Sequence, residues 1–190
     1  QRLEKQVLDA PELVPHPEYL TDKDAFMAEI LLSLETDESL IIIQAVDNVA
    51  TRKLINEVVF GKLVENRILT VALDSGNDDQ GGQVVLYANG GVRNEEPFKG
   101  PQLGLLPTML QVFPDLDAVD DNNPGLVMDC AENAESKPQA MMCNVRNGEL
   151  LAQIVIRLKE TGKAPGNLWR SDILTGNTKV EFTGFEQTAN

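Results

Sequence analysis

A strand–helix–strand pattern near residue 50 constrains the fold of this chain more than any other feature of its sequence. Residues 40–46 and 68–73 are short, mostly apolar and rich in β-branched side chains. Each indicates an interior strand, although periodicity leaves a helix open for the first. Between them, apolar residues recur at three- and four-residue steps, which predicts an amphipathic helix over residues 47–66. We therefore expect an α+β or α/β fold.

The same criteria predict the remaining elements. Further strands are expected at residues 83–88, 125–131, 139–145 and 179–185. Further helices are expected at residues 1–10, 21–35, 108–112 and 149–160. The dipeptide Asn147-Gly148 is a turn signal and is expected to introduce the last of these helices. Residues 75–82 are polar and glycine-rich, so they are expected to form a loop.

The length and composition of the chain suit one globular domain, with 190 residues, 42% of them hydrophobic and 24% charged. We expect residues 21–190 to form this single domain, with a mixed β-sheet of about five to seven strands covered by amphipathic helices. Prolines at 11, 15 and 17 separate it from an N-terminal arm, residues 1–20. The long irregular segment 92–124 is expected to carry the working surface, because long loops are frequently functional.

Negative charge is concentrated in one part of the chain. Ten of the fourteen excess negative charges lie in residues 68–136, which hold twelve carboxylates and only two basic residues, Arg93 and Lys99. Such a field repels phosphate backbones and anionic lipid, which argues against nucleic acid and membranes as partners. It favours a protein partner with a basic surface.

Seven aspartates of this stretch are candidate metal ligands, gathered in two predicted loops. They are Asp74, Asp78, Asp79, Asp115, Asp117, Asp120 and Asp121. Calcium and magnesium bind several oxygen ligands from flexible loops, so the residue types suit a divalent cation. The spacing does not match an EF-hand, because a loop begun at Asp115 has Asp120 where glycine is required and Leu126 at its twelfth position. A solvated acidic surface is the alternative interpretation.

The sequence contains no recognisable arrangement of catalytic residues, and we assign none. His16, the sole histidine, lies between two prolines, and nothing in the sequence places it near a nucleophile. Cys130 and Cys143 are both expected inside apolar strands rather than at a helix start beside a base, so neither resembles an activated thiol. One histidine and two cysteines are too few ligands for a recognised zinc motif. No cofactor is expected apart from the divalent cation.

An apolar cluster in the irregular segment leaves two interpretations open. Its members are Phe98, Leu103, Leu105, Leu106 and Met109. They are expected to form either a satellite core or a pocket for a small apolar ligand.

Together these features predict a non-catalytic interaction, assembly or regulatory protein whose acidic central surface engages a basic partner. The alternative hypothesis is a calcium- or magnesium-dependent enzyme or metal-stabilised module. The N-terminal arm is a candidate for homo-oligomerisation. No apolar run is long enough to cross a bilayer, and two reduced thiols fit Cys130 and Cys143 better than the disulfide that an oxidising compartment would allow, so a soluble protein of the cytoplasm or another reducing compartment is favoured. Because the chain opens at Gln1 rather than Met, removal of an upstream segment is also considered.

Overall fold

The protein is built on one mixed β-sheet, as the sequence predicts. A computed structural model describes residues 20, 22–34, 40–46, 48–66, 68–77, 81–89, 106–117 and 138–183. Within these residues a five-stranded sheet has the strand order β1-β2-β3-β4-β5. The expected fold class, a single mixed sheet covered by helices, is confirmed.

The strands are β1 (Leu40–Gln44), β2 (Thr70–Asn77), β3 (Gly81–Ala88), β4 (Leu168–Asp172) and β5 (Thr178–Glu181). Strands β1 and β2 are parallel, because a helical crossover connects them, and every other neighbouring pair is antiparallel. Strand β3 lies at the centre and is buried over most of its length. Its burial on both faces matches its nearly continuous apolar sequence.

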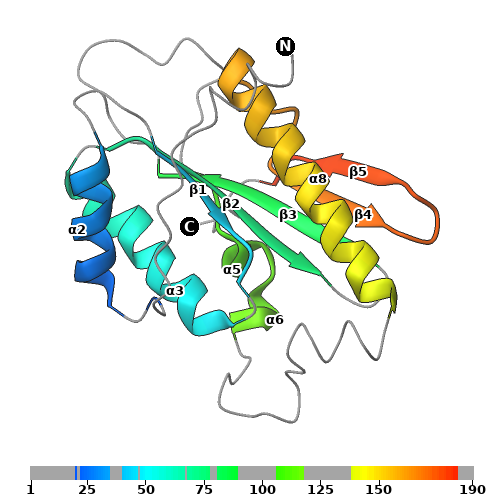
Figure 1. Cartoon of the computed structure of the whole chain (residues 1–190), viewed down its shortest axis with the longest axis horizontal. Coiled ribbons are helices and arrows are strands. Elements are labelled where there is room, and N and C mark those ends of the chain that lie inside the picture. The colour runs from blue at the N-terminus through cyan, green and yellow to red at the C-terminus, as the bar shows by residue number, and fades with distance from the viewer. Residues whose placement is uncertain are drawn as a thin grey trace, which may run out of the picture.

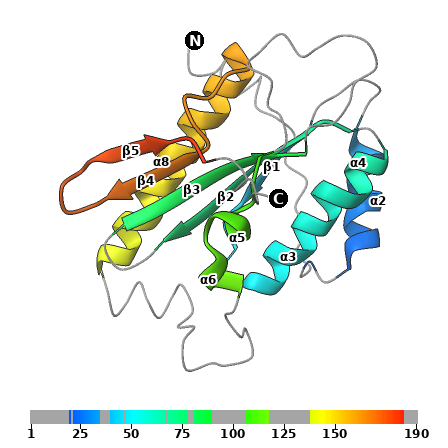
Figure 2. The same cartoon turned by 180° about the vertical axis from the view of Figure 1, so that it is seen from behind.

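Helices cover both faces of the sheet. Helix α8 (Pro138–Thr161) lies across one face and packs on β2 and β3 (Figure 1). Helix α3 (Val49–Glu57) and the short helices α5 (Met109–Val112) and α6 (Pro114–Asp117) lie on the opposite face (Figure 2). The sheet is therefore the middle layer of three.

The predicted helix 47–66 is present, but it is not a uniform α-helix. After α3 it continues through a π-helical turn, η1 (Val58–Lys62), into the short α4 (Leu63–Glu65). Helix α2 (Lys23–Ser33) corresponds to the predicted helix 21–35 and packs against α3 and η1. Asp22 caps α2, since its Oδ1 accepts hydrogen bonds from the backbone N–H groups of Asp24 (2.8 Å) and Ala25 (3.1 Å).

The buried apolar side chains build two hydrophobic clusters, and the larger one includes residues on both faces of the sheet. The larger cluster includes Trp169, which pairs with Val84 across β4 and β3, and the buried residues of α8. On the other face, the Tyr87 ring stacks on Phe60 of η1 with ring centroids 5.7 Å apart. The smaller cluster joins Val85 and Leu168 of the sheet to Met109 of α5. Met109 is thus a core residue, as in one of the two interpretations of the apolar cluster above.

The prediction of a strand at residues 139–145 is wrong, because this segment is the first part of α8. Short apolar runs fit either period, and Ala and Met favour a helix. Once the helix is continuous, Cys143, Leu150 and Ile154 are buried at helical spacing. Cys143 therefore lies in a buried helix rather than in a strand.

The helix expected at residues 149–160 is present within α8, but its expected start at Asn147-Gly148 is wrong, since both residues lie inside the helix. The Asn147 amide Nδ2 donates to the Gly76 carbonyl at 2.8 Å, and its Oδ1 lies 3.4 Å from Ser171 Oγ as acceptor. Contacts with the sheet therefore satisfy the side chain that would otherwise favour a turn.

The limits of several strands also differ from prediction. Strand β4, which carries Trp169, has no counterpart among the predicted strands. Strands β2 and β3 extend into residues 75–82, so part of the expected loop is paired sheet. Among the described strands, β1 lies at one edge of the sheet, and its Ile43 is 53% exposed.

Some expectations fall outside the described residues. They concern the N-terminal arm (1–20, except residue 20), the predicted strand 125–131, and the irregular segment 92–124 apart from residues 106–117. In the described part of that segment, Leu106 forms a β-bridge with Ala88, and Thr108 begins α5 with a capping box completed by Gln111.

Candidate functional site

The seven predicted metal ligands do not share one environment. Asp74 lies within β2 rather than in a loop, and its side chain is fully buried in an ion pair with Arg52. Asp115 is exposed on α6, and Asp117 ends that helix. Asp78, Asp79, Asp120 and Asp121 lie outside the described residues. Among the residues that are described, no group of three His, Cys, Asp or Glu side chains is placed to hold a metal ion.

Asp74 belongs to a buried polar cluster that sequence reasoning missed. We define this cluster as Gln44, Arg52, Asp74 and Tyr87. Gln44 and Asp74 are neighbours in the register of β1 and β2, at the carboxyl ends of these parallel strands. Because α3 begins directly after β1, it places Arg52 over the same ends of the sheet. Ligand sites of open α/β sheets commonly lie at this position.

The hydrogen bonds of the cluster tie α3 to the sheet. Arg52 Nη2 donates to the carbonyl oxygens of Val46 (2.6 Å) and Ser75 (3.0 Å), and Nη1 contacts the Asp74 carboxylate. Gln44 Nε2 donates to the Tyr87 hydroxyl oxygen. Burial raises the pKa of Tyr87 above its usual range, while the hydrogen bond from Gln44 and the charge of Arg52 act in the opposite direction.

This cluster is closed to solvent. The side chains of Arg52 and Asp74 are 9% and 0% exposed, and Gln44 and Tyr87 are as deeply buried. A substrate has no open route to a carboxylate that is both covered and paired with an arginine. The cluster therefore fixes α3 on the sheet rather than presenting reactive groups.

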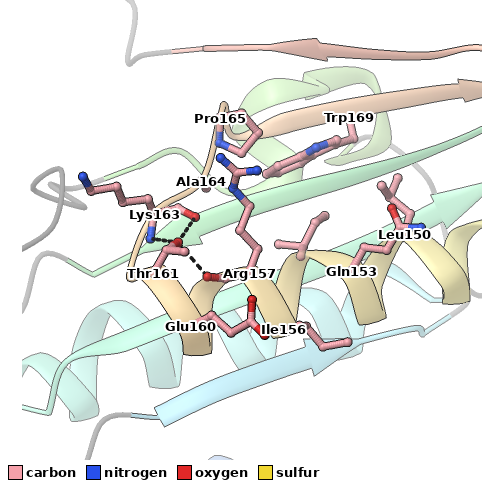
Figure 3. Close-up of a pocket in the computed structure, with 11 residues that line it drawn as sticks. Leu150, Gln153, Ile156, Arg157, Glu160, Thr161, Lys163, Ala164, Pro165 and Trp169 are labelled. Carbon is pink, nitrogen blue, oxygen red and sulfur yellow. Dashed lines mark hydrogen bonds between the residues drawn. The ribbon is translucent and has the colours of Figure 1, made fainter.

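An open site lies on the other face of the sheet, between α8 and β4 (Figure 3). It is a pocket of about 530 Å³, within the range of small-molecule sites. Its apolar wall is formed by Leu150 and Ile154 of α8 and by Trp169 of β4, with Ala164 and Pro165 at the connecting segment. We call it the α8–β4 pocket.

The end of α8 shapes one rim of this pocket. Gly162 has a φ of +63°, the left-handed conformation that glycine adopts readily, and its N–H donates to the Leu158 carbonyl at 2.8 Å. Thr161 Oγ1 donates to the Arg157 carbonyl (2.8 Å) and accepts from the Lys163 N–H (3.1 Å), as Figure 3 shows. The chain is thus turned back toward the sheet by defined hydrogen bonds.

The charged residues of the rim are Arg157, Glu160 and Lys163. All three are exposed. Within the described part of the chain, no carboxylate forms an ion pair with Arg157 or Lys163. In Figure 3 the Arg157 side chain extends from α8 toward Pro165 and Trp169. Two basic residues therefore line the pocket, and the guanidinium of Arg157 lies beside its apolar wall, in a chain whose net charge is −14.

The sequence alone gave no indication of this pocket, because β4 was not predicted. Because strand β4 was not predicted, the sequence did not place Trp169 next to the helix that carries Arg157. The one available signal was a single tryptophan close in sequence to a basic helix end.

Comparison with known proteins gives no assignment: no family model matches the chain, and neither a curated protein nor a solved structure does. Among the described helices, none has the length and apolar character needed to cross a bilayer.

Proposed function

We propose that this protein is a non-catalytic binding protein that engages a basic protein partner through its acidic central stretch, residues 68–136. The observation that carries the proposal is the charge of that stretch, twelve carboxylates against two basic residues. Complementary charge increases the rate at which two proteins meet and selects against partners of the same sign.

The structure narrows the set of acids available for this role. Asp74 is buried against Arg52 and contributes nothing to a surface field. Asp115 is exposed on α6, and among the described residues it does not belong to any group of side chains that could hold a metal ion. The proposal therefore depends on Asp115 and on acids of the stretch other than Asp74.

Exposed apolar side chains on α8 also favour a protein-binding role. Met141, Met142, Val145 and Ile156 are between 52% and 61% exposed. Apolar side chains that remain exposed on one helix are typical of interaction surfaces, and methionine suits such surfaces because its side chain is flexible.

The test is the association of the full chain with a defined basic probe, a lysine-rich amphipathic helical peptide, at low and high salt. We expect the association rate to fall by about tenfold or more between 50 and 500 mM NaCl, because salt screens exposed charges. The variant Asp120→Lys/Asp121→Lys should slow association further at low salt.

The matched control is Asp24→Lys/Glu65→Lys, which changes the net charge by the same amount outside the acidic stretch, on α2 and α4. Equal slowing by both variants would mean that net charge alone drives binding. Binding that does not depend on salt would contradict the proposal directly.

A further inference from the structure

We infer that the α8–β4 pocket binds a small monocarboxylate with an apolar body. The site is distinct from the acidic stretch, because the residues that line it lie between 150 and 169. Its occupant is identified by two properties of the lining, an apolar wall and a cationic rim.

The wall suits the apolar body of a ligand. Leu150 and Ile154 are buried core residues of α8, and the Trp169 indole is 3% exposed, so all three are held in place by packing. A cavity of about 530 Å³ against such a wall accommodates a chain or ring of several carbon atoms. Transfer of those carbons out of water then favours binding.

The rim suits one carboxylate. An arginine guanidinium donates two parallel hydrogen bonds to a carboxylate, and a lysine ammonium adds a mobile positive charge. Arg157 and Lys163 both line the pocket; in Figure 3 the Arg157 guanidinium lies beside Trp169 and the Lys163 side chain extends away from it. Neither has an ion-pair partner among the described residues, so neither has to exchange one for the ligand.

Glu160 limits the charge of the ligand. It also lines the pocket, between the two basic residues in the sequence, and its negative charge repels a second negative charge on the ligand. The negative field of the whole chain acts in the same direction. A monoanion is therefore preferred over a phosphate monoester, which carries nearly two charges at neutral pH.

Trp169 allows a direct test, because it is the single tryptophan of the chain and lines the pocket. The full chain is titrated with octanoate, 1-octanol, acetate and octyl phosphate, with tryptophan fluorescence and isothermal calorimetry recorded in parallel. We expect saturable binding of octanoate, and binding weaker by about tenfold or more for each of the other three probes.

Two variants and one control locate the site. Arg157→Gln should weaken octanoate binding by about tenfold or more, because it removes the charged donor. Ala164→Phe should abolish it by filling the cavity from the connecting segment. Lys159→Gln makes the same change of charge on the same helix, outside the pocket lining, and should leave octanoate binding unchanged.

Circular dichroism tests whether each variant is folded. If the Ala164→Phe variant does not fold, the octanoate affinity of Arg157→Gln alone tests the location of the site. Absence of saturable octanoate binding by both methods would overturn the inference. Equal binding of octanoate and octanol, or equal losses in Arg157→Gln and Lys159→Gln, would overturn it as well.

Discussion

At the scale of single residues, the Arg52–Asp74 pair differs from the other described ion pairs. Both of its side chains are buried, whereas Lys23 and Glu57, for example, are 49% and 62% exposed. Exposed pairs contribute about 0–1 kcal/mol to stability, while removing one partner of a buried pair leaves an uncompensated charge in the interior. Sequence reasoning placed Asp74 in an acidic loop because it could not identify Arg52, 22 positions earlier in the chain, as its partner.

Loss of Arg52 should therefore be costly. We expect Arg52→Met to lower the free energy of unfolding by about 3–5 kcal/mol, and the double variant Arg52→Met/Asp74→Leu to recover most of that loss. The control Lys23→Met should cost less than about 1 kcal/mol. Urea denaturation of the four proteins, wild type included, measures these differences. A double variant no more stable than Arg52→Met would show that the buried charge is not the cause.

Tyr87 should make stability depend on alkaline pH. Burial raises the pKa of Tyr87 in the folded state. The stability that comes from this difference is therefore fully present below the unfolded-state pKa of about 10. Above that pH the unfolded chain releases the phenolic proton more readily, and stability should fall by about 1.4 kcal/mol per pH unit. The variant Tyr87→Phe should not lose stability in this way, because it has no phenolic proton. The measurement is the slope of unfolding free energy against pH between 9 and 11, and parallel slopes for the two proteins would contradict the assignment.

At the scale of elements, local sequence patterns predicted the strands and helices that pack on nearby residues. The strand–helix–strand unit of β1, α3 and β2 was found because each element shows the apolar pattern of its own structure, continuous in the strands and at three- and four-residue steps in the helix. Strand β4 and the first part of helix α8 were not found, because their signals depend on distant partners, whereas the rest of α8 matches the predicted helix 149–160. Asn147-Gly148 resembles a turn until the Asn147 amide is seen to bond to the Gly76 carbonyl, 71 positions away. The α8–β4 pocket was missed for the same reason.

Two glycines near this contact should respond oppositely to alanine. A Cβ at Gly82 would collide with the Asn147 amide, whereas a Cβ at Gly148 meets nothing within 4 Å. We expect Gly82→Ala to destabilise the protein by about 1–3 kcal/mol through displacement of Asn147. Gly148→Ala should stabilise it by up to about 1 kcal/mol, since alanine favours a helix interior. Thermal melts of both variants test this, and destabilisation by Gly148→Ala would mean that α8 is not helical at that position.

At the scale of the whole molecule, composition and charge predicted one mixed sheet and an acidic protein, and the sheet is confirmed. The positions of the acidic residues relative to one another in the fold could not be predicted from the sequence. Asp74 and Asp115 belong to the same acidic stretch, yet one is buried in β2 and the other is exposed on α6. Spacing along the chain carries no information on such a difference, because burial is set by partners elsewhere in the fold.

Thermal melts with and without divalent cations distinguish the proposed function from the metal hypothesis. A site filled at a hundredfold excess over its dissociation constant stabilises a protein by about 2.7 kcal/mol, or about 5–10 °C for a chain of this size. We expect calcium, magnesium and manganese each to shift the melting temperature by less than about 1 °C, because the proposed function requires no bound ion. A saturable shift of several degrees with one ion would favour the metal hypothesis instead, and Asp120→Asn/Asp121→Asn would then locate it.

The strand order has a consequence for synthesis on the ribosome. Strand β3 has β2 as one neighbour, already made when it emerges, but its other neighbour, β4, begins about 80 residues later. At about 5–20 residues per second, one edge of this central strand stays without its native neighbour for about 4–16 seconds. During that interval nascent chains are open to capture by chaperones or by one another.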